Sequence, residues 1–545
     1  MDSANATNPV RPLMSGPRLL PLLLPALSSL LATSTAVAAA ETGFERTAAG
    51  KGPDGRDNGQ IHACTGIRID TTAVISVRAG AAGGGNGSAA PPLASINAAI
   101  TAAKAGDIVQ VAAGTYAENV RLGTYASPTG KDLTLLGGFR ADFAVRDAAA
   151  PVSIIDGGLL DPAVQLHVDS AQTSVLDGFR ITRGRGLGND YSNGYGHGGG
   201  VHVQRNGNGQ TIVSHNEVVD NETRNHTNAD SRGGGIHAQI QAWGGATGSV
   251  RIEDNLVRGN HAGKGAGINV AGGRAVLLRN RVEDNIGHGD HGGGIYVSTR
   301  VTEVRDNVIR ANVTGASAGY GWGGGIIVAA AGAELSGNLV SDNFAPTTGA
   351  GLFWDEGAVG SMRNDLVVGN RCPQGNRSGA ALYLDGGPGG PSTVTLENVT
   401  VADHVCPGTA PDGAAIVVEG GSVLAIGNSI LHGNSRDFRS LSGGSITISH
   451  SITREAGIGN FDQDPLFADP GNGNYHLRST AGRLGPHGWV HDAVSSPAID
   501  AGDPGADFSR ETVPNGGRVN LGAYGNTPEA SRSGGSDLIF ASGFD

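Results

Sequence analysis

Apolar residues alternate with other residues over short stretches that follow runs of glycine. Residues 290–297 read DHGGGIYV, so that Ile295 and Val297 flank Tyr296. A period of two is typical of a β-strand, with Ile295 and Val297 on one face and Tyr296 on the other. The spacing of three or four residues that marks a helix is absent here. The pattern therefore predicts a short strand that begins at Ile295.

This phrase recurs along the chain. Closely related copies occupy residues 196–203, 231–238, 263–270 and 321–328, and weaker copies occupy 348–354, 378–384 and 412–418. The first apolar residues of the copies are Val201, Ile236, Ile268, Ile295, Ile326, Leu352, Leu382 and Ile416. The steps are about 26 to 35 residues, which indicates a repeat array. Because one short strand cannot bury a face alone, successive copies must stack.

A second phrase, Asn-x-(Val/Ile/Leu)-x-x-Asn, alternates with the first. It occupies residues 216–221, 255–260, 280–285, 307–312 and 338–343, with looser copies at 365–370 and 398–403. We therefore expect two short strands per repeat, with glycine or asparagine at the corners, where the chain turns tightly or adopts a left-handed conformation. Asparagines at one corner of every coil could form a ladder of hydrogen bonds along the axis.

The two phrases predict an all-β fold, a right-handed single-stranded parallel β-helix (solenoid) with a short N-terminal capping helix. The helix is expected after Ser95, because Ile96, Ala99, Ile100 and Ala103 share one face. Such a helix would cover the open end of the first coil. A propeller is the alternative, but its blades need four strands and longer periods.

Composition agrees with a thin, stacked core. The chain has 91 glycines among 545 residues and only 5% aromatic residues. No Gly-X-Y period is present, which excludes collagen. The net charge of −12 argues against nucleic acid or anionic lipid as a partner.

Residues 1–40 resemble a signal peptide. Arg11 and Arg18 precede an apolar run at 19–31, which is too short to span a membrane, and small residues at 36–40 offer cleavage sites. No other stretch is expected to cross a bilayer. We therefore expect an exported, soluble monomer in which residues 41–72 form a lead-in.

Two of the three cysteines occupy equivalent places in the repeat. Cys372 and Cys406 each precede a repeat anchor, Leu382 or Ile416, by about ten residues. Stacked coils would place them about 4.8 Å apart, which suits a disulfide. Two unpaired buried thiols are the alternative, and Cys64 is left over.

Several segments resemble those of a known bacterial group. LASINAAITAAKAGDIVQVAAGTYAENV (93–120) and GNSILHGN (427–434) resemble the entry and late coils of secreted β-helix proteins. DPLFADPGNGNYHL (464–477), SPAIDAGDP (496–504) and NLGAYG (520–525) resemble the closing segment of choice-of-anchor Q proteins.

The resemblance implies a β-helix at 73–460, a closing segment at 461–528 and a linker with a sorting tail at 529–545. A frayed end is the alternative for the tail. The resemblance also implies a protein secreted by a bacterium or held at its cell surface, and it fixes no reaction.

Stacking would turn equivalent outward residues into rows about 4.8 Å apart. The first row, the outward column, is His202, His237, Asn269, Tyr296, Ile327, Phe353, Tyr383 and Val417. The second column, two positions further along, is Gln204, Gln239, Ala271, Ser298, Ala329, Asp355, Asp385 and Glu419. Aromatic rings stack on sugars, and amides and acids bind hydroxyls. We therefore predict a polysaccharide groove with Tyr296, Phe353, Tyr383, Gln204 and Gln239 as binding residues.

Two chemistries are conceivable in such a groove. Asp355, Asp385 and Glu419 could serve glycoside hydrolysis or hold Ca²⁺. A lyase would need a proton acceptor such as His202 or His237, with Arg232 and Lys264 on adjacent turns. The simpler interpretation is that these polar residues are only solvated.

Other motifs are weaker. Asp469, Asn472 and Asn474 could bind Ca²⁺, but the EF-hand spacing is missing and a turn is the simpler interpretation. Gly-His-Gly at 196–198 and 287–289 resembles a pectin-hydrolase signature without its companion elements, so we interpret both as turns. No cofactor is certain.

Two functions therefore remain open. One is an exported protein that binds, and in one version cleaves, a polysaccharide or cell-surface glycan. The other is a structural surface protein or adhesin without an active site.

Overall fold

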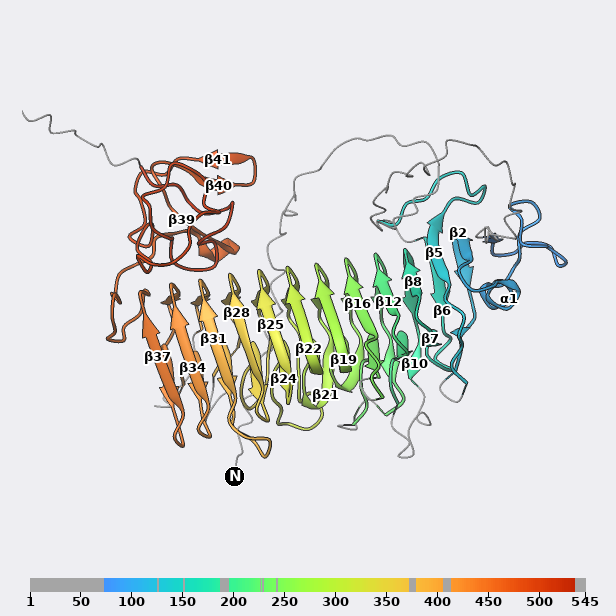
Figure 1. The fold of residues 1–545 in the computed structure, drawn as a ribbon, viewed down its shortest axis with the longest axis horizontal. Helices are drawn as coiled ribbons and strands as arrows, with labels where there is room; N and C mark the ends of the chain where they lie inside the picture. The colour runs from blue at the N-terminus through green and yellow to red at the C-terminus, as the bar shows by residue number, and fades with distance from the viewer. Residues whose placement is uncertain are drawn as a thin grey trace, which may run out of the picture. The chain divides into compact units, whose positions relative to one another are not determined.

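The computed structural model describes residues 73–534, apart from 125–126, 150–151, 187–195, 226, 228–229, 242–243, 372–378 and 405–412. These residues form a parallel β-helix in which equivalent strands stack coil upon coil (Figure 1). Apart from Gly485–Gly488, the described residues belong to one compact unit.

Each full coil has three strands, which we call the first, second and third rows. One coil runs through β15 (Ile236–Ile240), β16 (Ser249–Glu253) and β17 (Leu256–Arg258). The expectation of two strands per repeat is therefore wrong. The second-row strands were missed because they carry no glycine or asparagine phrase. Their outward residues are polar, as in SVRIE, so they read as links in the sequence.

The first and second rows share a 22-stranded sheet, because β19 (Ile268–Leu278) and β22 (Ile295–Arg305) run through both. The other first-row strands are β4 (Val120–Leu122), β7 (Val164–Asp169), β11 (Val201–Asn206), β24 (Ile326–Ala329), β27 (Leu352–Asp355), β30 (Leu382–Leu384), β33 (Ile416–Val418) and β36 (Phe438–Ser440). The other second-row strands are β1 (Val74–Val77), β2 (Ile108–Ala112), β5 (Thr134–Phe139), β8 (Thr173–Asp177), β12 (Gln210–Ser214), β25 (Gly332–Ser336), β28 (Val359–Arg363), β31 (Thr393–Glu397), β34 (Val423–Gly427) and β37 (Ser445–Ser449).

The third row is a separate 11-stranded sheet, and a short sheet of four strands lies beyond it in the coil. The other third-row strands are β3 (Gly114–Tyr116), β6 (Ser153–Asp156), β9 (Phe179–Thr182), β13 (Glu217–Val219), β20 (Arg281–Glu283), β23 (Val308–Arg310), β26 (Leu339–Ser341), β29 (Leu366–Val368), β32 (Thr400–Ala402) and β35 (Ile430–His432). The four-stranded sheet is β10 (Arg185–Gly186), β14 (Glu222–Thr223), β18 (His261–Lys264) and β21 (Ile286–His291).

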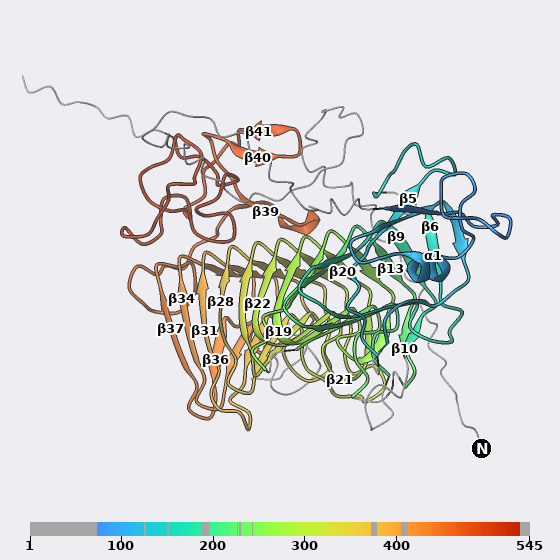
Figure 2. The same ribbon diagram turned by 45° about the vertical axis from the view of Figure 1, so that its right-hand side comes forward.

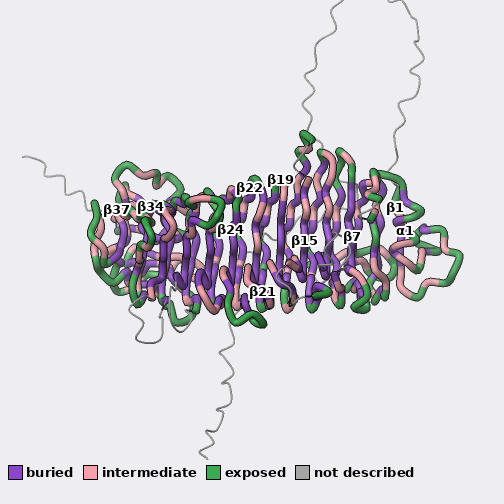
Figure 3. The backbone as a smooth tube through the Cα atoms, turned by 90° about the horizontal axis from the view of Figure 1, so that it is seen from below, coloured by how far each residue is buried: buried purple, intermediate pink, exposed green. Residues whose placement is uncertain are grey.

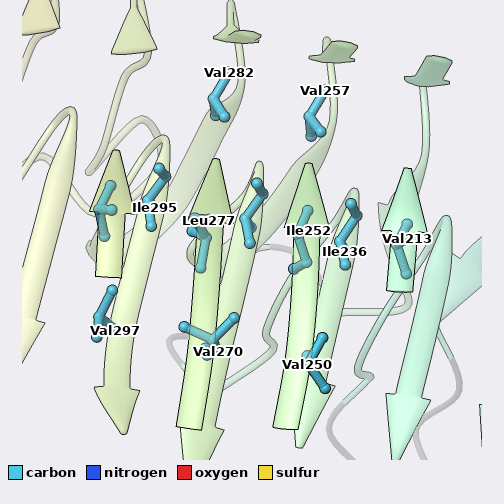
Figure 4. Packing of buried hydrophobic residues seen from close by; sticks show 14 of the residues in the cluster. Val213, Ile236, Val250, Ile252, Val257, Val270, Leu277, Val282, Ile295 and Val297 are labelled. Atoms are coloured by element: carbon cyan, nitrogen blue, oxygen red, sulfur yellow. The ribbon is translucent and has the colours of Figure 1, made fainter. Parts of the chain in front are cut away.

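The core lies inside the coil and is filled by stacked aliphatic side chains. In Figure 4, Val250 and Ile252 of the second row point inward together with Ile236 of the first row and Val257 of the third. All four are fully buried. Figure 3 shows buried residues along the strands and exposed ones mainly at the links. Inward alternation of Val and Ile is therefore confirmed.

Two ladders of asparagine side chains flank the third row, where one was expected. One runs through Asn216, Asn255, Asn280, Asn307 and Asn338, and the other through Asn221, Asn260, Asn285, Asn312, Asn343 and Asn370. In each step the Nδ2 group donates to the Oδ1 atom of the next coil, as from Asn260 to Asn285 at 3.0 Å. The same Oδ1 atom also accepts a main-chain N–H, from Asn260 in this case. The ladders therefore satisfy buried polar groups at both corners.

The N-terminal helix is confirmed as α1 (Ile96–Ala102), which lies at the N-terminal end of the coils (Figure 2). It contacts β1, β2 and β4. Ser95 caps it by accepting a hydrogen bond from the Ala98 N–H. The carboxylate of Glu118 accepts the N–H groups of Ile96 and Asn97. Since these donors have no partner within the helix, the distant carboxylate completes the cap.

The closing segment is a compact region with little regular structure. Its strands β38 (Phe467–Asp469) and β39 (Asn474–Leu477) pair antiparallel around a 3₁₀ turn (η1, Pro470–Asn472), and β40 (Arg483–Gly485) pairs with β41 (Gly488–Val490). It packs on the outer face of the late third-row strands through a second apolar cluster. That cluster includes Leu366, Val368, Ile430, Phe467, Tyr475, Leu477, Leu521 and Ala523.

Several predictions concern residues outside this description. The signal peptide, Cys64, Cys372, Cys406 and the sorting tail beyond residue 534 all lie outside the described residues. The disulfide therefore stays a prediction. Within the described part of the chain, no helix is long and apolar enough to cross a membrane.

Candidate functional site

The outward column forms in the predicted register. His202 pairs with His237, His237 with Asn269, and Asn269 with Tyr296. The row then continues through Ile327, Phe353, Tyr383 and Val417. In the second column, Gln204 pairs with Gln239 and Ala329 with Asp355.

The expectation that this column is open to solvent is wrong for most of its length. His202 and His237 are 0% and 1% exposed, Phe353 and Tyr383 are 3% exposed, and only Tyr296 is half-buried. Outward residues of a strand are not necessarily solvated, because the links between strands can fold over them.

The covering residues precede the glycines of each coil. They form a second row, which we call the cover ladder: His197, Arg232, Lys264, His291, Trp322 and Thr348. The glycine after each of them passes close to the column, and a Cβ atom on Gly349 would lie 3.0 Å from the Cβ of Phe353. Gly349 also has a φ of +62°, which glycine adopts without strain. Glycine therefore lets the cover ladder close over the column.

Aromatic rings link the two rows. The ring centroids of His291 and Trp322 are 5.0 Å apart, and those of Trp322 and Phe353 are 6.4 Å apart. Phe353 and Tyr383 stack at 5.4 Å with an interplanar angle of 14°. Phe353 and Tyr383 thus belong to a small apolar cluster that also contains Val417, so their rings stack on each other and not on a ligand.

The two candidate histidines lie in a buried group. The His202 and His237 rings are 5.3 Å apart, and the Nδ1 atom of His237 lies 3.0 Å from the Oδ1 atom of Asn269. Burial lowers the pKa of His237 well below its ordinary value, and the nearby His197, His202 and Arg232 lower it further. Burial from solvent makes His202 and His237 poor proton acceptors for a sugar.

The candidate acids end their strands in turns. Oδ1 of Asp355 accepts the Glu356 N–H at 2.7 Å, and Oδ1 of Asp385 accepts the Gly386 N–H at 2.7 Å. Glu419 accepts a hydrogen bond from the Tyr383 hydroxyl. Asp355, Asp385 and Glu419 are each half-buried. These carboxylates therefore stabilise local structure and still reach solvent.

The surroundings of Asp355 shift its pKa away from that of a solvated carboxylate. Burial raises its pKa, and the negative charges of Asp385 and Glu356 raise it further. His291 acts in the opposite direction. A carboxyl whose pKa is raised by burial and by a neighbouring carboxyl is a pattern found in acid–base pairs.

The accessible aromatic residues lie beside the column. Tyr320 is 52% exposed, and Trp322 and Tyr296 are half-buried. The Tyr320 and Trp322 rings are 5.9 Å apart at 64°. We call Tyr296, Tyr320 and Trp322 the Trp322 rim. Tyr320 and Trp322 precede the glycines of their coil, so the strand alternation that predicted the outward column did not include them.

Charges of both signs surround this rim. Burial raises the pKa of Tyr296 to about 12, Arg232 opposes this shift, and the acidic Glu356, Asp355 and Asp290 add to it. Lys264 lies 3.9 Å from Asp230, and Asp290 contacts the His291 imidazole. Gln204 and Gln239 are half-buried three and two coils before Tyr296.

In the described part of the chain, no group of three or more His, Cys, Asp or Glu side chains is arranged to hold a metal ion. At the DPGNGN motif the Asn472 amide donates to Asp469 at 2.7 Å across the turn.

Comparison with known proteins adds little to this geometry. Residues 430–502 match the family model described as "Disaggregatase related". This match spans the late coils and part of the closing segment. No curated protein matches the chain. The solved structure titled "Crystal structure of pectate lyase Pel9A" aligns over 83% of this chain and 96% of that chain, with 17% identity and a TM-score of 0.33.

Proposed function

We propose that this parallel β-helix protein is exported and binds an extracellular or cell-wall polysaccharide at the Trp322 rim. The observation that carries the proposal is the pairing of two accessible aromatic rings, Tyr320 and Trp322, beside half-buried charged groups. Flat rings offer apolar contact to the face of a sugar, and neighbouring polar groups accept and donate hydrogen bonds to its hydroxyls.

Cleavage is a second candidate. Asp355 with its raised pKa beside Asp385 favours acid–base hydrolysis of a glycosidic bond over a lyase reaction by the buried His202 and His237. In this version Asp355 donates a proton to the leaving oxygen and Asp385 is the second carboxyl group of the pair.

A structural surface protein or adhesin is the alternative. The burial of the outward column favours it, because most of the predicted groove residues stabilise the fold.

Glycan-array binding by the exported chain tests the proposal. We expect binding that Trp322→Ala weakens by about 10-fold or more, since a buried aromatic contact is worth about 1.5 kcal/mol. Trp489→Ala is the matched control, because Trp489 is also half-buried but packs on Arg532 in the closing segment. Equal glycan binding by the Trp322→Ala and Trp489→Ala variants would show that the Trp322 rim is not the binding site.

A screen of the bound glycan for shortened products tests cleavage. Asp355→Asn should abolish product formation and leave binding intact. Absence of glycan binding in the wild type would favour the structural alternative.

A further inference from the structure

A bulge in the four-stranded sheet exposes a histidine that the glycan proposal does not use. Strands β18 and β21 pair in parallel, but the register shifts between Ala262 and Lys264, which pair with Gly287 and His291. Residues 288–290 therefore face the single Gly263. Bulges re-aim side chains and are common beside active sites. The Gly-His-Gly sequence at 287–289, interpreted above as a turn, begins this bulge.

The bulge carries His288 into a chain of three side chains. The Oγ atom of Ser317 lies 2.8 Å from Nδ1 of His288. Nε2 of His288 lies 2.9 Å from Nδ1 of His261. With the proton of both imidazoles on Nε2, Ser317 donates to His288 and His288 donates to His261. Every link of the chain then has one donor and one acceptor.

The main chain fixes this arrangement. The Ser317 N–H donates to the carbonyl oxygen of His288 at 3.3 Å, and the Ala316 N–H donates to that of Gly287 at 3.0 Å. Gly319 closes the turn by donating to the Gly315 carbonyl at 3.0 Å. Ser317 is exposed, and both imidazoles are half-buried. The hydroxyl is therefore held against its base and remains open to a substrate.

We propose that Ser317, His288 and His261 form a site for hydrolysis of acyl esters. A nucleophile bonded to a base, with that base oriented by a third group, is the arrangement that activates a serine hydroxyl. Ser317 and His288 are the catalytic residues, and His261 is a positioning residue. The same link of the chain continues to Tyr320 and Trp322, so an acyl group on a sugar hydroxyl fits as substrate.

The reaction balances with water as the only co-reactant. Oγ of Ser317 attacks the ester carbonyl carbon, and its proton passes to Nδ1 of His288. The single bond between the carbonyl carbon and the alkoxy oxygen of the ester then breaks. The alcohol leaves with the proton from His288. Water, deprotonated by His288, then cleaves the acyl-serine and releases the carboxylic acid. His288 returns the proton to Ser317.

Hydrolysis of p-nitrophenyl acetate by the full exported chain tests this site. We expect Ser317→Ala and His288→Ala each to reduce kcat by about 100-fold or more. A fluorophosphonate probe should label Ser317, as located by mass spectrometry. Ser88→Ala is the control, because Ser88 is also exposed and lies in a bend, where its main-chain N–H donates to Asn86. Undiminished hydrolysis by Ser317→Ala, or no hydrolysis and no labelling in the wild type, would overturn the proposal.

Two variants separate the role of His261 from a structural one. His261→Asn keeps an acceptor for His288 and should retain most of kcat, whereas His261→Phe should lower kcat with KM unchanged. Equal kcat values for both variants would remove His261 from the site. Only the choice of an ester on a sugar rests on the function proposed above. A protein that hydrolyses p-nitrophenyl acetate and binds no glycan contradicts that function and leaves the Ser317 site standing.

Discussion

Two positions of the asparagine ladders carry a titratable residue in place of asparagine. Asp365 follows Asn338, and its Oδ1 atom accepts both the N–H and the Nδ2 group of Asn338 at 2.8 Å. His404 stands between Asn370 and Asn434, with its Nε2 3.3 Å from the first amide and its Nδ1 3.1 Å from the second Oδ1. A neutral imidazole reproduces the polarity of an asparagine, whereas a carboxylate can only accept.

Burial shifts the pKa values of these two residues in opposite directions. The pKa of Asp365 rises to about 7, and that of His404 falls to about 4. Asp365 thus contributes stability below its ordinary pKa that is lost as the pH rises through about 7. His404 contributes stability above its ordinary pKa that is lost as the pH falls through about 4. Between pH 4 and 6.5 the two slopes have opposite signs, each about 1.4 kcal/mol per pH unit.

We therefore predict that Asp365→Asn alters the pH profile of stability. Removing Asp365 removes its unfavourable slope, so the stability of the variant relative to the wild type should rise by about 1.4 kcal/mol per pH unit from pH 4 to 6.5. The variant should therefore be more stable than the wild type at pH 8. Thermal unfolding over this pH range measures the difference in stability. Asp342→Asn is the control, because Asp342 is exposed. Identical profiles for wild type and Asp365→Asn would contradict the assignment.

At the scale of the element, each third-row strand is held between two ladders. The side chain of Asn285 accepts from the N–H and Nδ2 of Asn260, and it donates to the Val257 carbonyl and to Asn312. Its removal would leave several buried polar groups without partners. Each such group costs about 1 to 3 kcal/mol.

We predict that Asn285→Leu lowers the free energy of unfolding by about 3 kcal/mol or more. The neighbouring Asp284→Gly should change it by less than about 1 kcal/mol, because Asp284 is exposed and has a φ of +54° that glycine adopts freely. Urea unfolding followed by circular dichroism distinguishes them. Similar midpoints for the two variants would show that the ladder contributes little.

Aromatic residues of the outward column join neighbouring strands, as the stacked rings of Phe353 and Tyr383 do. Phe353→Ala should destabilise the protein by about 3 to 5 kcal/mol, as expected for a buried phenylalanine. Tyr320→Ala should leave the unfolding temperature unchanged, since Tyr320 is exposed. If Tyr320→Ala lowered the unfolding temperature more than Phe353→Ala does, the assignment of Phe353 to the buried cluster would be contradicted.

At the scale of the whole molecule, the third row changes character along its length. Its outer face carries Arg281 and Glu283 in the middle coils and Leu366 and Ile430 in the late coils. The closing segment covers the late, apolar part through residues such as Leu521. Polar contacts accompany it: the Asn364 amide donates to the carbonyls of Ala523 and Gly525 at 3.1 and 2.7 Å, and the Tyr475 hydroxyl donates to Asp403 at 2.6 Å.

We predict that Leu521→Asp releases the closing segment from the coils. A charge cannot stay in this apolar contact unpaired, so the segment should become sensitive to protease and the coils should bind a hydrophobic dye. Val513→Asp is the matched control, because Val513 is 73% exposed. Equal protease resistance of both variants would show that the segment is held by other contacts.

The sequence by itself determined the stacked coils, the inward residues, the register of the outward column and the capping helix. These follow from alternation and spacing, which are local properties repeated in every coil. The second-row strands escaped prediction because their polar outer residues resemble links.

Only the tertiary structure decided what lies over the outward column. His202, His237, Phe353 and Tyr383 are buried. The cover ladder recurs four positions before each repeat anchor, but this spacing does not indicate that its side chains fold over the column. Likewise, Ser317, His288 and His261 meet although 29 and 27 residues separate the bonded pairs. A bulge and a turn bring them together.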